Sequence, residues 1–193
     1  GLVRIEASGA VTLRGLISAN GGDASYDGLT SGGAGGAIYV ACQTFGGDAT
    51  ALIRVNGGNA MTAGLGGGGG GGRIAVNYTA VAASHAVRFS SAPATNTWSA
   101  PDPHNRWFAQ PRPGTLWLPD AQLLGATLDG AQFPGAVNIV GLTNWAPASL
   151  TVSNAVVGFG EHSVTLGVTN DILVEAGGVL GIGAFGAGSN CLL

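Results

Sequence analysis

Short segments of alternating apolar and polar residues recur along this chain. The alternation runs through residues 16–19 and 37–41, and it runs again through residues 52–55 and 73–78. A period of two residues with many β-branched side chains is typical of a β-strand that has one buried face. No segment combines a 3.6-residue period with helix-capping signals, so we expect an all-β protein.

The same alternation resumes in the second half of the chain. The segments concerned are residues 115–118, 126–128, 137–140, 150–152, 164–166, 172–174 and 179–182. Residues 150–154 and 166–170 share the pattern Leu-x-Val-x-Asn at a spacing of 16 residues. This spacing predicts that the second half is built from repeating units shorter than those of the first half.

A 36-residue repeat relates the first two pairs of predicted strands. Residues 16–40 align with residues 52–76 without a gap, and 14 of the 25 positions are identical. The identities include Leu, Ile, Asn, Ala and Val positions, so glycine content alone does not produce the match. Each unit consists of a strand, an Asn-Gly-Gly corner, a long glycine-rich loop and a second strand. Such units bury their apolar face only when they stack, so we predict a right-handed parallel β-solenoid (β-helix).

Glycine makes up 36 of the 193 residues, and seven glycines are consecutive from Gly66 to Gly72. Because glycine loses more conformational freedom on folding than any other residue, such loops need packing partners. Two arrangements supply them. The loops either form stacked extended backbone that hydrogen-bonds to the next rung, or they form a bundle of polyproline-II-like segments. The sequence leaves both open.

We divide the chain into three parts. Residues 1–91 contain the glycine-rich solenoid repeats, residues 92–113 form a Pro/Trp-rich loop or insertion, and residues 114–193 continue the solenoid with shorter rungs. The middle part is set apart because proline is poorly tolerated in central strands. Its Trp and Phe content is too high for a flexible linker, so we expect it to be ordered.

The composition excludes several classes of protein. Only 9% of the residues are charged, 46% are hydrophobic, and the net charge is −3. Disordered chains combine low hydrophobicity with high charge, so this chain is expected to fold. None of the basic residues is a lysine, which excludes a phosphate-binding P-loop, and no basic surface for nucleic acid is expected. The sequence has no uninterrupted apolar run of about 18 residues, so we expect no membrane-spanning helix.

The acidic residues are spread thinly, which argues against catalysis. Hydrolysis of a polysaccharide usually needs two carboxylates that face one another across the sugar. Asp23 and Asp27 share a loop, but the repeat places Asn59 and Ala63 at the corresponding positions. The sequence also lacks a Gly-x-Ser-x-Gly nucleophile motif. We therefore predict no catalytic residues.

Glycine-rich segments can form metal or cofactor sites. The calcium-binding repeat of glycine-rich β-helices reads Gly-Gly-x-Gly-x-Asp. Residues 32–36 fit this pattern, but Ala37 and, in the second copy, Arg73 stand where the aspartate is needed. We therefore predict no metal site of this kind, and an incidental calcium site near Asp23 and Asp27 stays open. The glycine run lacks a strand-to-helix context for dinucleotide binding, so no cofactor is predicted.

The two cysteines, Cys42 and Cys191, are far apart in the sequence and show no metal-ligand spacing. We favour two free buried thiols over one long-range disulfide.

The Pro/Trp-rich part contains the one candidate binding site. Aromatic rings and hydrogen-bonding groups gather there within eleven residues: Trp98, Asp102, His104, Asn105, Arg106, Trp107 and Phe108. A flat ring packs against the C–H bonds of a sugar while polar groups bind its hydroxyls, so these residues predict a glycan-binding surface. The alternative is that the aromatics cover the side of the solenoid, since Trp is usually largely buried.

The repeat resembles large secreted glycine-rich β-solenoid surface proteins of bacteria of the Verrucomicrobia and Planctomycetes type, which are autotransporter-like. The resemblance rests on residues 17–22, 32–40, 67–78 and 114–118. It implies an extracellular or cell-surface location. It implies little about activity.

Our main functional hypothesis is a non-catalytic structural segment of a secreted or cell-surface protein. Residues 3–7 look like the closing strand of a preceding unit, and residues 183–189 look like the start of another glycine-rich block. We therefore expect end-to-end stacking, through self-association or continuation of the same chain, into a rod or fibre. A glycan-binding adhesin module that uses residues 98–108 is the first alternative. A polysaccharide-degrading β-helix enzyme is the second.

Overall fold

The computed structural model describes residues 1–25, 30–60, 67–94, 111–160 and 164–183. Within these residues it contains sixteen β-strands and no helix. The strands of the first half are β1 (Leu2–Glu6), β2 (Ala10–Leu13), β3 (Leu16–Ser18), β4 (Ala37–Gly47), β5 (Leu52–Arg54), β6 (Arg73–His85) and β7 (Arg88–Ser90). Those of the second half are β8 (Thr115–Trp117), β9 (Thr127–Asp129), β10 (Ala136–Val140), β11 (Asn144–Trp145), β12 (Leu150–Ser153), β13 (Val156–Phe159), β14 (Thr165–Leu166), β15 (Ile172–Val174) and β16 (Val179–Ile182).

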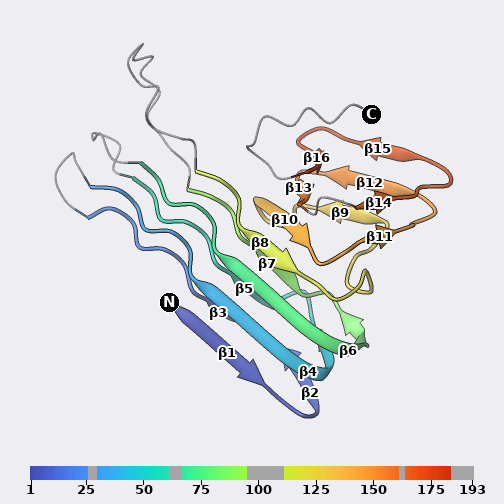
Figure 1. The fold of residues 1–193 in the computed structure, drawn as a ribbon, viewed down its shortest axis with the longest axis horizontal. Helices are drawn as coiled ribbons and strands as arrows, with labels where there is room; N and C mark the ends of the chain where they lie inside the picture. The colour runs from blue at the N-terminus through green and yellow to red at the C-terminus, as the bar shows by residue number, and fades with distance from the viewer. Residues whose placement is uncertain (26–29, 61–66, 95–110, 161–163, 184–193) are drawn as a thin grey trace.

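The strands form parallel sheets, as Figure 1 shows. The largest sheet has the order β1-β4-β6-β8-β10-β13-β16, and β2 also pairs with β4. Two three-stranded sheets have the orders β3-β5-β7 and β15-β12-β9, and β11 pairs with β14. Each recorded strand pair is parallel. The expected all-β, parallel class is confirmed at this level.

Strands of the first half pair in the register of the sequence repeat. Leu16 lies opposite Leu52 in the small sheet, and Ala37 lies opposite Arg73 in the large sheet. The small sheet continues with the same spacing, since Leu52 lies opposite Arg88. A third unit therefore follows the two that the sequence comparison detected.

The expected 16-residue rung in the second half is wrong. Leu150 of β12 pairs with Ile172 of β15, whereas Leu166 of β14 pairs with Trp145 of β11. The two similar segments thus lie in different sheets and do not stack on one another. Short apolar strands share a pattern whatever sheet they join, so the pattern could not identify their partners.

The core is a column of apolar side chains along the inner face of the large sheet. Because parallel strands stack in register, equivalent residues lie above one another. The fully buried members include Val40, Val76, Leu116, Ile139 and Phe159. Side chains of the smaller sheets complete the column, among them Ile53, Phe89, Leu128, Leu150 and Val152. The rings of Phe89 and Phe133 stack with centroids 6.5 Å apart.

Three pairs of extended segments leave the sheets on one side of the molecule, and Figure 1 shows them running alongside one another. We call each pair a glycine arm with two legs. The first arm consists of residues 19–25 and 30–36, the second of residues 55–60 and 67–72, and the third of residues 91–94 and 111–114. The third arm contains the described ends of the Pro/Trp-rich part.

Hydrogen bonds join the two legs of each arm and also join each arm to the next. Within the first arm, the N–H groups of Gly33 and Gly36 donate to the carbonyls of Gly22 and Ala19, at 2.8 and 2.7 Å. Between arms, Gly32 and Gly35 donate to the second arm, where their acceptors are the carbonyls of Gly67 and Gly70.

The period of these bonds identifies the backbone state of the arms. Gly33 and Gly36 are three residues apart, as are Gly32 and Gly35, and Gly69 and Gly72 repeat the pattern in the second arm. A β-ladder would repeat every two residues, whereas a polyproline-II helix has three residues per turn. The arms therefore have the second of the two expected arrangements, a bundle of polyproline-II-like legs.

Close approach of the legs explains why many arm positions must be glycine. A Cβ atom added to Gly69 would lie 1.9 Å from the carbonyl oxygen of Gly33. Added to Gly58, it would lie 2.0 Å from the carbonyl oxygen of Gly22. By contrast, a Cβ on Gly67 would meet nothing within 4 Å.

Candidate functional site

The five residues predicted to bind glycans, Trp98, Asp102, His104, Arg106 and Trp107, lie outside the described residues. The chain on either side of them is described. The N–H of Ala94 donates to the carbonyl of Gly69, and the carbonyl of Arg112 accepts from Gly71, at 2.9 Å in both cases. Both ends of the predicted binding segment are thus attached to the second arm. The glycan-binding hypothesis stays a prediction.

A ladder of asparagine side chains connects the arms at their base. The Oδ1 atom of Asn20 accepts from the N–H of Asn56 at 2.9 Å. One arm further on, Oδ1 of Asn56 accepts from the N–H of Ala92 at 3.0 Å and from the Ser90 hydroxyl at 2.7 Å. The Asn-Gly-Gly corner that the sequence identified is therefore a point of contact between successive arms.

Asp23 has a similar role. One of its carboxylate oxygens accepts the N–H of Asn59 at 2.6 Å, which joins the first arm to the second. Its loop companion Asp27 lies outside the described residues. Among the described residues, no group of three or more His, Cys, Asp or Glu side chains could hold a metal ion.

The two ends of the stack of strands expose apolar side chains. At one end, Leu2 is 74% exposed and Leu16 is 55% exposed. At the other end, Ile172, Leu173 and Val174 of β15 are each about half exposed. In the described part of the chain, each of β1, β3, β15 and β16 pairs with a strand on one side alone. Both ends therefore offer unpaired backbone and apolar surface to a further strand.

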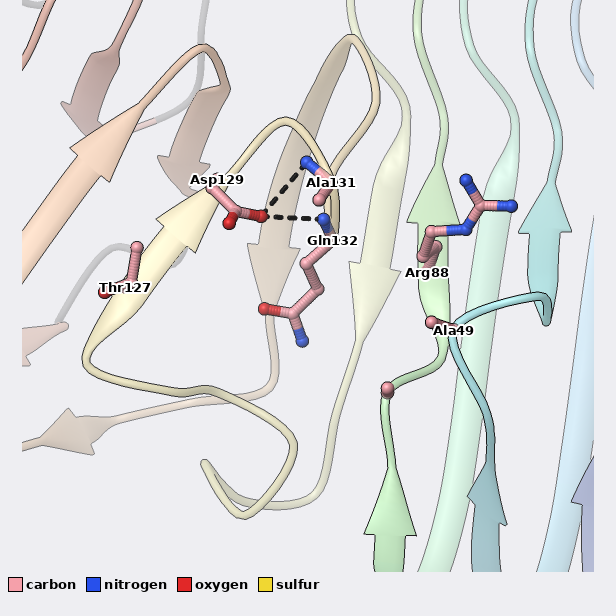
Figure 2. A pocket seen from close by; sticks show the side chains of 7 residues that line it. Ala49, Arg88, Thr127, Asp129, Ala131 and Gln132 are labelled. Atoms are coloured by element: carbon pink, nitrogen blue, oxygen red, sulfur yellow. Dashed lines mark hydrogen bonds between the residues drawn. The ribbon is translucent and has the colours of Figure 1, made fainter.

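A cavity of about 270 Å³ lies between β7 and β9, where the two three-stranded sheets are separated (Figure 2). Its polar lining comes from Arg88, Thr127, Asp129 and Gln132. One carboxylate oxygen of Asp129 accepts the N–H groups of Ala131 and Gln132, at 3.0 and 2.9 Å. Because these bonds close a turn, they give Asp129 a structural role.

The same cavity has a single carboxylate in its described lining, whereas the hydrolysis of a glycosidic bond usually needs two. In Figure 2 the Arg88 side chain extends away from Asp129. The Nε atom of Arg88 is buried without a hydrogen-bond partner among the described residues. No sequence pattern indicates this cavity, because its residues come from two sheets that lie far apart in the sequence and meet only in the fold.

Tyr78, a buried residue in the middle of strand β6, pairs with the partly buried Asp120. The hydroxyl of Tyr78 donates to the carboxylate of Asp120 at 2.8 Å. Burial, and then the bond to Asp120, raise the pKa of Tyr78 well above its usual value. Burial alone would raise the pKa of Asp120, but hydrogen bonds from Gln122 and Tyr78 outweigh it and lower that pKa. This pair joins β6 to the turn after β8.

Two further side chains that can titrate, Cys42 and His85, lie in the described part of the chain. Cys42 is a free, partly buried thiol whose pKa is raised by burial, and Cys191 lies outside the described residues. The Nδ1 atom of His85 lies 2.8 Å from the carbonyl of Ala82. In the described part of the chain, no helix is long and apolar enough to cross a membrane.

Comparisons of the chain with protein-family models, with curated proteins and with solved structures gave no match.

Proposed function

We propose that this chain is a non-catalytic, structural segment of a secreted or cell-surface protein. In this proposal the strands and arms are the successive rungs of a right-handed β-solenoid, which together form a rigid rod. The extracellular location rests on the resemblance of residues 17–22 and 32–40 to secreted glycine-rich solenoid proteins.

The observation that supports the rod most strongly is the common register of strands and arms. Leu16 pairs with Leu52 in a sheet, and 36 residues also separate Asn20 from Asn56, whose N–H it binds. Backbone, buried side chains and polar side chains thus repeat together. Units of this kind are held by contacts with their neighbours, so a stack of them resists bending at any single loop.

We further propose that rods join end to end. One end exposes Leu2 and Leu16, and the other exposes Leu173 and its neighbours on β15. Parallel strands at both ends have one unpaired edge each, which is the usual template for adding a strand from another molecule. Burying apolar side chains contributes roughly 25 cal/mol per Å², so contact between the two ends is favourable.

Negative-stain images of the parent chain and of Leu173→Lys test this proposal. The parent is expected to form elongated particles of variable length, and Leu173→Lys is expected to give short single rods because it places a charge in the junction. Asn77→Lys is the matched control, since Asn77 is exposed on β6 in the middle of the stack. Compact particles from the parent, or equal lengths for all three proteins, would contradict the proposal.

A further inference from the structure

Two arginines lie on neighbouring strands of the β3-β5-β7 sheet and on the same face of it. Leu52 of β5 pairs with Arg88 of β7, and Arg54 follows Leu52 by two residues. Ile53 and Phe89 are buried in the core, so both arginines project from the opposite, outer face. With strands about 4.8 Å apart and a rise of about 3.3 Å per residue, the Cα atoms of Arg54 and Arg88 are about 8 Å apart. Side chains as long as these can reach one small group from that distance.

Neither of the two arginines has an acidic partner in the described part of the chain. The ion pairs recorded there involve other arginines, Arg4 and Arg14. Strands β3, β5 and β7 contain no acidic residue. Asp129 lines the cavity beside Arg88, but Figure 2 shows the Arg88 side chain extending away from it. Two positive charges therefore share this face, and no described carboxylate neutralises them.

The same two side chains have unused hydrogen-bond donors. The Nε atoms of Arg54 and Arg88 are both buried and have no hydrogen-bond partner among the described residues. Both side chains are partly exposed as a whole, so their outer parts remain open to solvent. A buried donor without a partner lowers stability, and so does repulsion between like charges on neighbouring strands. An anion bound between the two guanidinium groups would relieve the repulsion and accept hydrogen bonds from both.

The repeat shows that packing does not require arginine at these positions. The residues 36 positions before and after Arg54 are Ser18 and Ser90, and the residue 36 positions before Arg88 is Leu52. These equivalents form the same strands in the same sheet. Serine and leucine thus suffice for the fold, and the two arginines need another reason.

We propose that Arg54 and Arg88 bind a doubly charged phosphate group on the outer face of this sheet. The planar guanidinium group matches the oxygen atoms of phosphate and forms short, charge-assisted hydrogen bonds with them. A phosphate dianion balances both arginines, whereas a carboxylate balances one. Thr127 and Gln132 line the cavity of about 270 Å³ beside Arg88, which leaves room for an organic group attached to the phosphate. This binding site goes beyond the structural role proposed above and does not depend on it.

The test measures the urea unfolding midpoint of the full 193-residue chain as phosphate replaces chloride at constant ionic strength, at a pH where phosphate is a dianion. Arg54→Ser and Arg88→Leu introduce the residues that the repeat has at equivalent positions, so both variants are expected to fold. Arg73→Ala is the matched control, because Arg73 is exposed on the large sheet and pairs there with its equivalent, Ala37. The double variant Arg54→Ser/Arg88→Leu measures the general stabilising effect of phosphate on a folded protein.

The midpoint of the parent and of Arg73→Ala is expected to rise equally and to saturate with phosphate. Each single variant at the site is expected to need at least about tenfold more phosphate for half of its rise, because it loses charge-assisted hydrogen bonds. The same rise in all the proteins would show a general salt effect and overturn the inference. Acetate in place of phosphate is expected to give no difference between the parent and the single variants; a difference as large as that with phosphate would overturn the choice of a dianion.

Glycerol phosphate distinguishes the two sources of the phosphate group. If the parent responds to it as it does to inorganic phosphate, and the two single variants do not, the site accepts a phosphate ester of a larger molecule. A response to inorganic phosphate alone assigns the site to the free ion. A response of the parent to neither compound beyond that of the double variant would reject the site.

Discussion

Gly69→Ala is the substitution that tests most sharply how the glycine arms hold together. Gly69 lies in the buried centre of the bundle, and a Cβ there would be 1.9 Å from the carbonyl oxygen of Gly33. Ordinary contact begins at 3.4 Å, so the leg that contains Gly69 would have to move about 1.5 Å away from the leg of the first arm that contains Gly33. Movement of that size breaks hydrogen bonds that now measure between 2.8 and 2.9 Å.

Three hydrogen bonds hold the legs at this point. They run from Gly69 to Gly58, from Ala94 to Gly69 and from Gly58 to Gly33. Each contributes about 1 kcal/mol net, so their loss costs about 3 kcal/mol. Alanine restricts the unfolded chain and returns about 0.4–1 kcal/mol. We therefore expect Gly69→Ala to lower the free energy of unfolding by about 2 kcal/mol.

Urea unfolding followed by circular dichroism measures this change. Gly67→Ala is the control, because it has the same effect on the unfolded chain but meets nothing within 4 Å in the folded one. It should leave the stability unchanged or raise it by up to about 1 kcal/mol. If the two variants shift the unfolding midpoint equally, close packing of the legs is not the reason for glycine at position 69.

Three other predictions concern single side chains. Asn56→Ala leaves the N–H of Ala92 without its acceptor and should lower the free energy of unfolding by about 2 kcal/mol in urea titrations, whereas no loss would show that the asparagine ladder is dispensable. Ser91→Ala should raise the stability by about 1 kcal/mol, because the buried Ser91 hydroxyl has no hydrogen-bond partner among the described residues; a decrease would contradict this. The pKa of Asp120 is lowered in the fold, so the stability that Asp120 contributes is complete above its unfolded pKa of about 3.9 and is lost as the pH falls through the folded value. Tyr78→Phe removes one donor to Asp120 and should make unfolding midpoints less dependent on pH in acid; an unchanged pH profile would refute the role of this bond.

The sequence predicted the first two units well because identical residues stand at equivalent positions of both. These identities give the register in which their strands pair. Leu16 and Leu52 were matched by position in the sequence and pair in the sheet. Strands were located by alternation, and each predicted segment overlaps an observed strand. Four strands were missed: Ala10–Leu13, Arg88–Ser90, Asn144–Trp145 and Val156–Phe159.

The third unit could not be recognised in the sequence, because few of its residues are identical to those of the first two units. Its strand β7 has Arg88 where the second unit has Leu52, and its arm has Pro93 and Pro113 in place of glycines. These replacements follow from its position, since an arm without a following neighbour needs neither the small residue nor the N–H. The last unit of a repeat differs from the others for this physical reason.

The roles of the candidate residues depend on contacts between distant parts of the chain, so the sequence alone could not predict these roles. Asp23 was considered as a catalytic or calcium-binding residue, and its carboxylate binds the backbone of the next arm. The polyproline-II-like state of the arms was one of two open alternatives. Only the three-residue period of bonds such as Gly33 to Gly22 distinguishes it from β-structure.

Sedimentation velocity of the parent chain at increasing concentration tests most directly whether the rungs form a rod that extends end to end. The account predicts elongated species whose size grows with concentration, because the exposed side chains of Leu2 at one end and Leu173 at the other are buried when two ends meet. A single compact monomer at the highest concentration reached would contradict it.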